Sequence, residues 1–144
     1  MVEILTIPYV HFQDWDILQL FLERRKNPPY KISGDLNLFD SPIESLGNLE
    51  SVDGNLNLYY SQIESLGNLK SVRGYLVLQG STIKSLGNLE SVGGFLSLNN
   101  SSIESLGNLK SVDGDLDLRW TPISKKYTKY KIRSMVNVGG NVYL

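Results

Sequence analysis

The chain has 144 residues and a formal net charge of −1, which fits one domain and does not favour a general polyanion binder. It contains no cysteine and a single histidine, His11, so a disulfide framework, a Cys-based metal site and a His cluster are excluded. No apolar run approaches the roughly 20 residues needed to cross a bilayer, and the N-terminus lacks the features of a signal peptide. We therefore expect an intracellular, cytoplasmic or particle-associated protein that makes no membrane contact.

Residues 1–31 precede the repetitive part of the chain and are predicted to form a helical cap. A helix is expected over residues 14–26, because an aspartate stands at its start, basic residues stand at its end and Asn27-Pro28-Pro29 would stop it. We interpret His11 as a residue of this cap, because no carboxylate or nucleophile is patterned around it. The apolar side chains of the helix would cover the first coil of the repeats: Trp15, Leu18, Phe21 and Leu22.

Residues 32–123 consist of five copies of a 20-residue unit, and 18 of the 23 leucines fall in its four leucine positions. In each unit a Gly-x-Leu-x-Leu segment alternates as a short strand does, and the remaining residues bend and return through a Gly-Asn turn. Because so short a unit cannot bury a core alone, the units are expected to stack at about 4.8 Å per coil. We predict a single α/β solenoid domain over residues 1–144, with a parallel sheet of about six strands and a helix at each end.

Three polar positions of the unit are also repeated. A hydroxyl position and an asparagine position are expected to bond the backbone of a turn or of the next coil, which is a structural role rather than a catalytic one. A third position alternates in charge, so that neighbouring coils would attract. The residues are Ser41, Ser61, Ser81, Ser101 and Thr121; Asn48, Asn68, Asn88 and Asn108; and Glu50, Lys70, Glu90 and Lys110.

The pattern Leu56-x-Leu58-x-x-Ser61-x-Ile63-x-x-Leu66-x-x-Leu69 resembles the leucine-rich repeat, with Ser or Thr where that family usually has Asn or Cys. The segment Val72-x-Gly74-x-Leu76-x-Leu78 is similar to the repeats of receptor L domains, and the SLGNLxSVxG array is similar to that of short phage- and virus-encoded proteins. The resemblance covers residues 32–123 and implies a solenoid whose curved surface binds something. It implies no catalytic residue.

Residues 124–144 depart from the repeat and are predicted to form a second cap, with a helix over residues 125–136 and a final strand over residues 140–144. This end is basic, because residues 114–144 carry a net charge of +4 and residues 1–113 carry −5. One interpretation is a contact with nucleic acid, an acidic protein or a particle surface. The interpretation that we favour is a solvated capping helix whose Tyr130, Met135 and Val136 pack inward. Nucleic acid is thus not an expected partner, and this helix is its only candidate contact.

The outward positions of the strands vary from unit to unit, whereas the apolar positions are copied. Outward aromatic and arginine side chains are typical of binding hot spots. The alternative is that rings such as Phe39 and Tyr59 only stack between neighbouring coils. The outward residues predicted to bind a partner are Phe39, Tyr59, Tyr60, Tyr75, Phe95, Arg119 and Trp120.

A short acidic segment, Asp113-Gly114-Asp115-Leu116-Asp117, is superficially similar to a calcium loop, but it lacks the glycine at the sixth position and the acid at the twelfth. We therefore predict no metal site and no cofactor. The function predicted from the sequence is a non-enzymatic protein–protein interaction module. The alternative is a structural component of a larger assembly, such as a phage particle.

Overall fold

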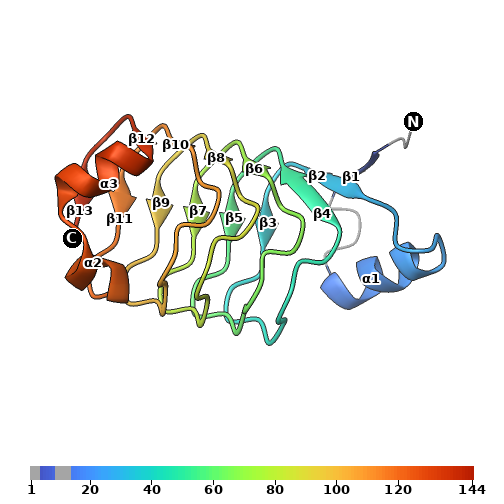
Figure 1. Ribbon diagram of the computed structural model, residues 1–144. Helices are drawn as coiled ribbons and strands as arrows, with labels where there is room; N and C mark the ends of the chain where they lie inside the picture. The colour runs from blue at the N-terminus through green and yellow to red at the C-terminus, as the bar shows by residue number, and fades with distance from the viewer. Residues whose placement is uncertain (1–3, 9–13) are drawn as a thin grey trace.

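The structure, a computed structural model, describes residues 4–8 and 14–144 and contains two parallel β-sheets. Figure 1 shows the coils stacked side by side along the long axis of the molecule, which confirms the predicted α/β solenoid architecture. The six-stranded sheet contains the predicted Leu-x-Leu strands. In spatial order it consists of β13 (Val142–Tyr143), β11 (Leu116–Asp117), β9 (Leu96–Ser97), β7 (Leu76–Val77), β5 (Leu56–Asn57) and β3 (Leu36–Asn37).

A second sheet, of seven strands, was not predicted. Most of its strands are the short Ser-Val segments that end each unit, and they pair in parallel at the repeat spacing, Ser71 with Ser91 and Val72 with Val92. In spatial order it consists of β1 (Leu5–Pro8), β2 (Tyr30–Ser33), β4 (Leu49–Val52), β6 (Ser71–Val72), β8 (Ser91–Val92), β10 (Ser111–Val112) and β12 (Asn137–Val138).

One apolar core fills the space inside the coils along the whole stack. The repeated leucines, isoleucines and valines are buried except for the half-buried Ile43 of the first unit, and the side chains of Leu56, Leu76, Leu96 and Leu116 are completely inaccessible to solvent. Equivalent residues lie directly above one another, because Leu56 pairs with Leu76 and Leu96 pairs with Leu116 in the sheet register. Each coil therefore buries its apolar side chains partly against the coils on either side.

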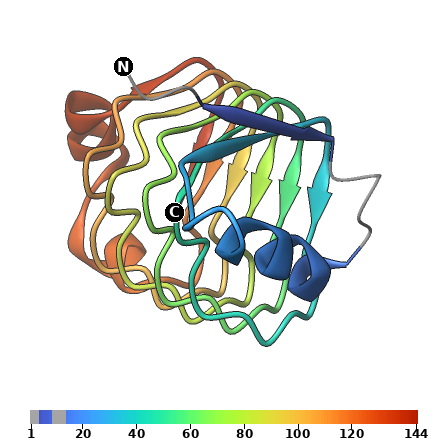
Figure 2. The ribbon, with the colours of Figure 1, turned by 90° about the vertical axis from the view of Figure 1, so that its right-hand side faces the viewer.

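The N-terminal cap consists of helix α1 and strand β1. Helix α1 (Trp15–Glu23) begins at the Asp14 N-cap, whose Oδ1 accepts hydrogen bonds from the Asp16 and Ile17 backbone N–H groups at 2.9 and 3.1 Å. It ends before the predicted residue 26, because Lys26 adopts a left-handed φ of 62°. Figure 2 shows α1 lying across the N-terminal end of the stack, with β1 next to β2 along the upper edge. As predicted, Leu18 and Leu22 are buried there, with Trp15 and Phe21 packed against the same core; His11 lies outside the described residues.

The C-terminal cap contains two short helices where one was predicted. Helix α2 (Pro122–Lys126) starts in a capping box between Thr121 and Ser124, and helix α3 (Lys129–Met135) starts at Thr128, whose Oγ1 accepts a hydrogen bond from the Lys131 N–H at 3.1 Å. The expectation that Tyr130 and Met135 pack inward is wrong, since they are 85% and 39% exposed. The inward side chains here are Ile123, Ile132 and Val136, and strand β13 then follows as predicted.

The repeated polar positions differ in what they do. Asparagines link coils, since Asn68 Nδ2 donates to Asn48 Oδ1 at 3.1 Å and Asn88 Nδ2 donates to the Gly67 carbonyl at 3.2 Å. In the alternating charge position, Lys110 Nζ lies 2.7 Å from Glu90 Oε1. The hydroxyl prediction is wrong for three residues, because no described residue bonds their buried Oγ atoms: Ser61, Ser81 and Ser101. Only small side chains fit these buried corner positions, so size explains the repetition there.

Candidate binding surface

The six-stranded sheet turns its leucines into the core and the residues between them outward, as the period of two requires. Residues before, between and after the two leucines of each strand segment therefore form three outward columns along the stack, which we call the strand face. The residue that follows lies at the corner of the coil and adopts a left-handed φ in every unit: Asp40, Tyr60, Gly80, Asn100 and Trp120. All seven predicted binding residues lie on this face or at its corner.

The first aromatic group on the strand face consists of Phe39, Tyr59 and Tyr60. The Phe39 and Tyr59 rings stack with centroids 5.6 Å apart and planes 9° from parallel, and the Tyr60 ring meets Tyr59 edge to face at 4.3 Å. Tyr60 also covers the next corner, because a Cβ built on Gly80 would lie 2.4 Å from Tyr60 Cδ1. The glycine at position 80 thus makes room for this ring.

The second aromatic pair is Tyr75 and Phe95, at the start of two neighbouring strand segments. Their centroids are 4.8 Å apart and their planes are 7° from parallel. Stacking accounts for one face of each ring, yet Phe95 remains 43% exposed. The rings therefore stack between coils, as one interpretation of the sequence expects, and Phe95 still offers apolar surface to solvent.

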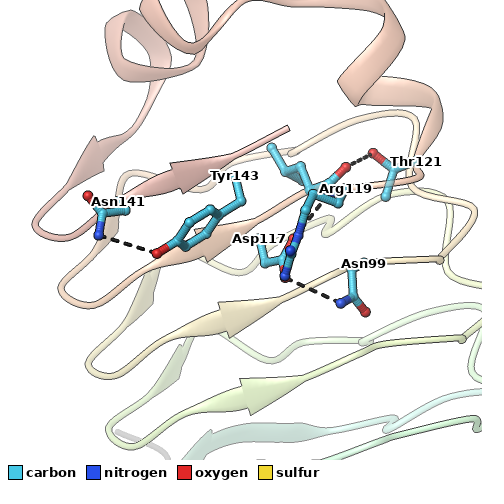
Figure 3. Close-up of polar contacts among 7 residues, drawn as sticks. Asn99, Asp117, Arg119, Thr121, Asn141 and Tyr143 are labelled. Atoms are coloured by element: carbon cyan, nitrogen blue, oxygen red, sulfur yellow. Dashed lines mark hydrogen bonds and ion pairs between the residues drawn. The ribbon is translucent and has the colours of Figure 1, made fainter.

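Farther along the stack the strand face becomes polar, around Asp117 (Figure 3). Arg119 Nη2 donates to Asp117 Oδ2 at 2.7 Å, Arg119 Nε donates to Oδ1 at 3.0 Å, and Asn99 Nδ2 donates to Oδ2 at 3.3 Å. Burial alone would raise the pKa of Asp117, but the hydrogen bonds from Arg119 outweigh burial, and the pKa lies below its usual value. The Arg119 guanidinium also lies 5.3 Å from the Tyr143 ring centroid. This bidentate pair holds the arginine flat against the sheet.

A cavity of about 270 Å³ opens on the strand face between Phe95 and Tyr143. The small Ser97 side chain also lines this space. Asp115 borders the cavity, and its Oδ1 accepts the Asn141 backbone N–H at 2.7 Å. Asn99 also belongs to the lining, and its Oδ1 is buried without a hydrogen-bond partner among the described residues. The lining thus combines two aromatic rings with the carboxylate of Asp115.

The structure divides the predicted site residues into three groups. Ring contacts join Phe39, Tyr59 and Tyr60 in one group and Tyr75 and Phe95 in another, while Arg119 lies 5.6 Å from the Trp120 ring centroid in a third. The prediction missed three residues that complete the last group: Asn99, Asp117 and Tyr143. The repeat register contained the signal for Tyr143, because it pairs with Asp117 at the middle outward position.

Two classes of site are not found in the part of the chain that the structure describes. Residues 4–8 and 14–144 contain no group of three or more His, Asp or Glu side chains placed to hold a metal ion. Among the same residues, no helix has the length and apolar character needed to span a membrane. Comparison of the chain with known protein families, with curated proteins and with solved structures finds no match.

Proposed function

We propose that the protein is a non-enzymatic module that binds another protein through its strand face. The exposure of large aromatic side chains carries this proposal: Phe39, Tyr60 and Phe95 are 56%, 49% and 43% exposed on the strand face or its corner. Rigid aromatic rings supply much contact area at a low entropic cost, and they are enriched in binding hot spots. The resemblance of the repeats to leucine-rich repeats supports the same surface.

The cavity beside Phe95 indicates what chemistry the partner brings. A side chain that enters it would pack its stem between the Phe95 and Tyr143 rings and place its end near Asp115. Asp117 is already neutralised by Arg119 at 2.7 Å, whereas Asp115 forms no ion pair with a described residue. A lysine or arginine side chain fits this combination of aromatic walls and one free carboxylate charge.

The non-enzymatic part of the proposal rests on the serines of the repeat. The hydroxyl groups of Ser61, Ser81 and Ser101 are buried beneath the corners, so these groups cannot reach a substrate in solution. A measurable turnover that survives charge substitution across the strand face would contradict this part.

The binding proposal can be tested by comparing two matched double variants. Tyr75→Glu with Phe95→Glu places charge on the strand face, and Ser71→Glu with Ser91→Glu places the same charge on the outward side of the seven-stranded sheet in the same two coils. In affinity capture with quantitative mass spectrometry, the first variant is expected to lose a protein that the wild type and the second variant retain. Both variants must keep a melting temperature near that of the wild type.

Equal capture by the two variants would overturn the proposal. Loss of folding in the first variant alone would mean that the two rings are needed for the stability of the fold. The milder Tyr75→Ser and Phe95→Ser variants would then separate binding from stability.

A second candidate function is a structural component of a larger assembly, such as a phage particle. It is supported by a strand edge that is unpaired among the described residues, at the C-terminal end of the six-stranded sheet. Strand β13 pairs only with β11, so its other edge has no described strand beside it. Unpaired strand edges favour addition of a further strand from another chain. Light scattering over a range of concentrations tests this candidate: growth into oligomers supports it, and a monomer at all concentrations that is also absent from particles contradicts it.

A further inference from the structure

The C-terminal cap gathers positive charge at one end of an otherwise acidic chain. Residues 118–144 contain no Asp or Glu. Helices α2 and α3 both lie at the end of the stack opposite to α1 (Figure 1). Their five basic side chains are all exposed, and we call them the cationic cap: Lys125, Lys126, Lys129, Lys131 and Arg133.

The positive charges of the cationic cap are not compensated within the described residues. None of its four lysines forms an ion pair or a side-chain hydrogen bond there, and Glu104, which lines a cavity with Lys126, does not pair with it. Arg133 differs, because its Nη1 donates to the Val138 carbonyl at 3.0 Å and its Nη2 donates to the Gly140 carbonyl at 2.7 Å. The lysines are therefore available to bind an anion.

An exposed aromatic side chain, Tyr130, stands between two lysines of the cationic cap. Tyr130 is 85% exposed, and the helical geometry of α3 explains why: Ile132 is buried, and a residue two positions away points to the opposite side. Lys129 and Lys131 flank Tyr130. A second ring, Trp120, is 72% exposed immediately before α2. The interpretation of this end as a solvated helix depended on Tyr130 packing inward, and its exposure removes that reason.

We propose that the cationic cap binds single-stranded nucleic acid, with its lysines on the phosphates and with Tyr130 and Trp120 stacked on bases. Nonspecific single-strand sites combine these two elements, a basic surface and exposed aromatic rings. The rings need unpaired bases, because the base faces of a duplex are already stacked. Helices of 5 and 7 residues are also short for reading a major groove.

A membrane surface fits the cationic cap less well. Helices that lie on membranes carry an apolar face opposite to their basic face. In α3 the inward face is occupied by Ile132 in the core, and the outward face carries Tyr130 and Ser134 between basic residues. This proposal shares Trp120 with the corner of the strand face, but its lysines and Tyr130 lie on the C-terminal cap, so Lys129→Ala and Tyr130→Ala test it separately from the protein-binding proposal.

The test is a titration of the full chain into a fluorescein-labelled oligothymidylate of about 12 nucleotides at about 50 mM salt, followed by fluorescence anisotropy. Saturable binding is expected, with the logarithm of the binding constant falling against the logarithm of salt concentration with a slope of about −3 for four or five phosphate contacts. Tyr130→Ala is expected to weaken binding at least about fivefold. Lys129→Ala is expected to weaken binding and to reduce the slope.

Lys84→Ala is the matched control, because Lys84 is equally an exposed lysine but lies on the repeats. It should leave the affinity almost unchanged. Three results would overturn the proposal: no binding at low salt, equal effects of Lys84→Ala and Lys129→Ala, or no effect of Tyr130→Ala and Trp120→Ala. Sedimentation with vesicles of phosphatidylserine and phosphatidylcholine tests the alternative ligand, a membrane surface. Vesicle binding without oligonucleotide binding would assign the cationic cap to a membrane.

Discussion

The two sheets share one core but differ in what they present to solvent. In the seven-stranded sheet the outward side chain is serine in four successive strands, Ser51, Ser71, Ser91 and Ser111. In the six-stranded sheet, the middle outward position of the same coils reads Asn57, Val77, Ser97 and Asp117. Since both sheets stack at the same spacing, the stack itself tolerates variation at outward positions. At these matched positions only the six-stranded sheet varies, and this difference supports the proposal that specificity resides on the strand face.

The largest effect is expected where a strand residue points inward. Leu96 is completely buried, so Leu96→Ala should lower the free energy of unfolding by about 2–5 kcal/mol. The adjacent outward substitution, Ser97→Ala, should change it by less than about 0.5 kcal/mol. Urea denaturation measures both. Comparable losses of unfolding free energy in the two variants would contradict the division of the six-stranded sheet into a side that packs on the core and a side that faces solvent.

Strand β2 of the seven-stranded sheet contains the buried phenol of Tyr30. Because of this group, the free energy of unfolding should change with pH in the alkaline range. Burial raises the pKa of Tyr30 to about 12, against a smaller opposing effect of Gln19. Because the folded-state pKa lies above the unfolded value of about 10, this contribution is complete below pH 10 and is lost as the pH rises toward 12.

The expected loss for Tyr30 is about 2–3 kcal/mol of unfolding free energy over that pH range. Tyr30→Phe should remove this part of the pH dependence, as measured by denaturation at each pH. Identical alkaline profiles for the wild type and Tyr30→Phe would contradict the raised pKa, because they would mean that folding does not change the ionisation of Tyr30.

The turns on the third side of the coils alternate between open and crowded glycines. Gly87 and Gly107 have nearly the same left-handed φ, 55° and 56°, but a Cβ at Gly107 would lie 2.6 Å from backbone atoms of Gly87, whereas one at Gly87 meets nothing within 4 Å. Gly107→Ala should therefore cost about 1–3 kcal/mol more than Gly87→Ala. Thermal denaturation of the two variants measures the difference, and equal costs would mean that adjacent turns do not pack as described.

The smallest effect concerns the stacked rings of the strand face. A double-mutant cycle on Tyr75 and Phe95, with rings 4.8 Å apart, should give a coupling of about 0.5–1.5 kcal/mol in unfolding free energy. Stacking would then account for only a small part of the stability. A coupling several times larger would assign these rings to the fold and weaken the binding proposal.

The repeat spacing was enough to predict the core and the six-stranded sheet. A leucine copied every 20 residues must lie against its own copy, which places Leu56 on Leu76. The last strand falls outside the 20-residue register and is predicted from its Gly140-x-Val142-x-Leu144 segment, in which Val142 pairs with Leu116. The second sheet could not be predicted in this way. Ser71–Val72 is a strand of two residues, too short to show alternation, and it becomes a strand only because the next coil pairs with it.

The caps and the candidate site were predicted only in part. The sequence pattern predicts one helix over residues 125–136, whereas Thr128 acts as an N-cap and divides the segment into α2 and α3. Tyr130 is predicted to pack inward, whereas the helix phase set by the buried Ile132 turns it outward. The Asp117–Arg119 pair depends on side-chain conformations that repeat spacing does not determine.

Site-specific photo-crosslinking tests most directly the claim that the strand face is the recognition surface. Ser97 and Ser91 are the same residue type in the same coil, both half-buried and outward, one on each sheet. A photoreactive side chain at Ser97 should attach to a discrete partner protein, and the same group at Ser91 should not. Equal attachment at both positions, or attachment only at Ser91, would contradict the account.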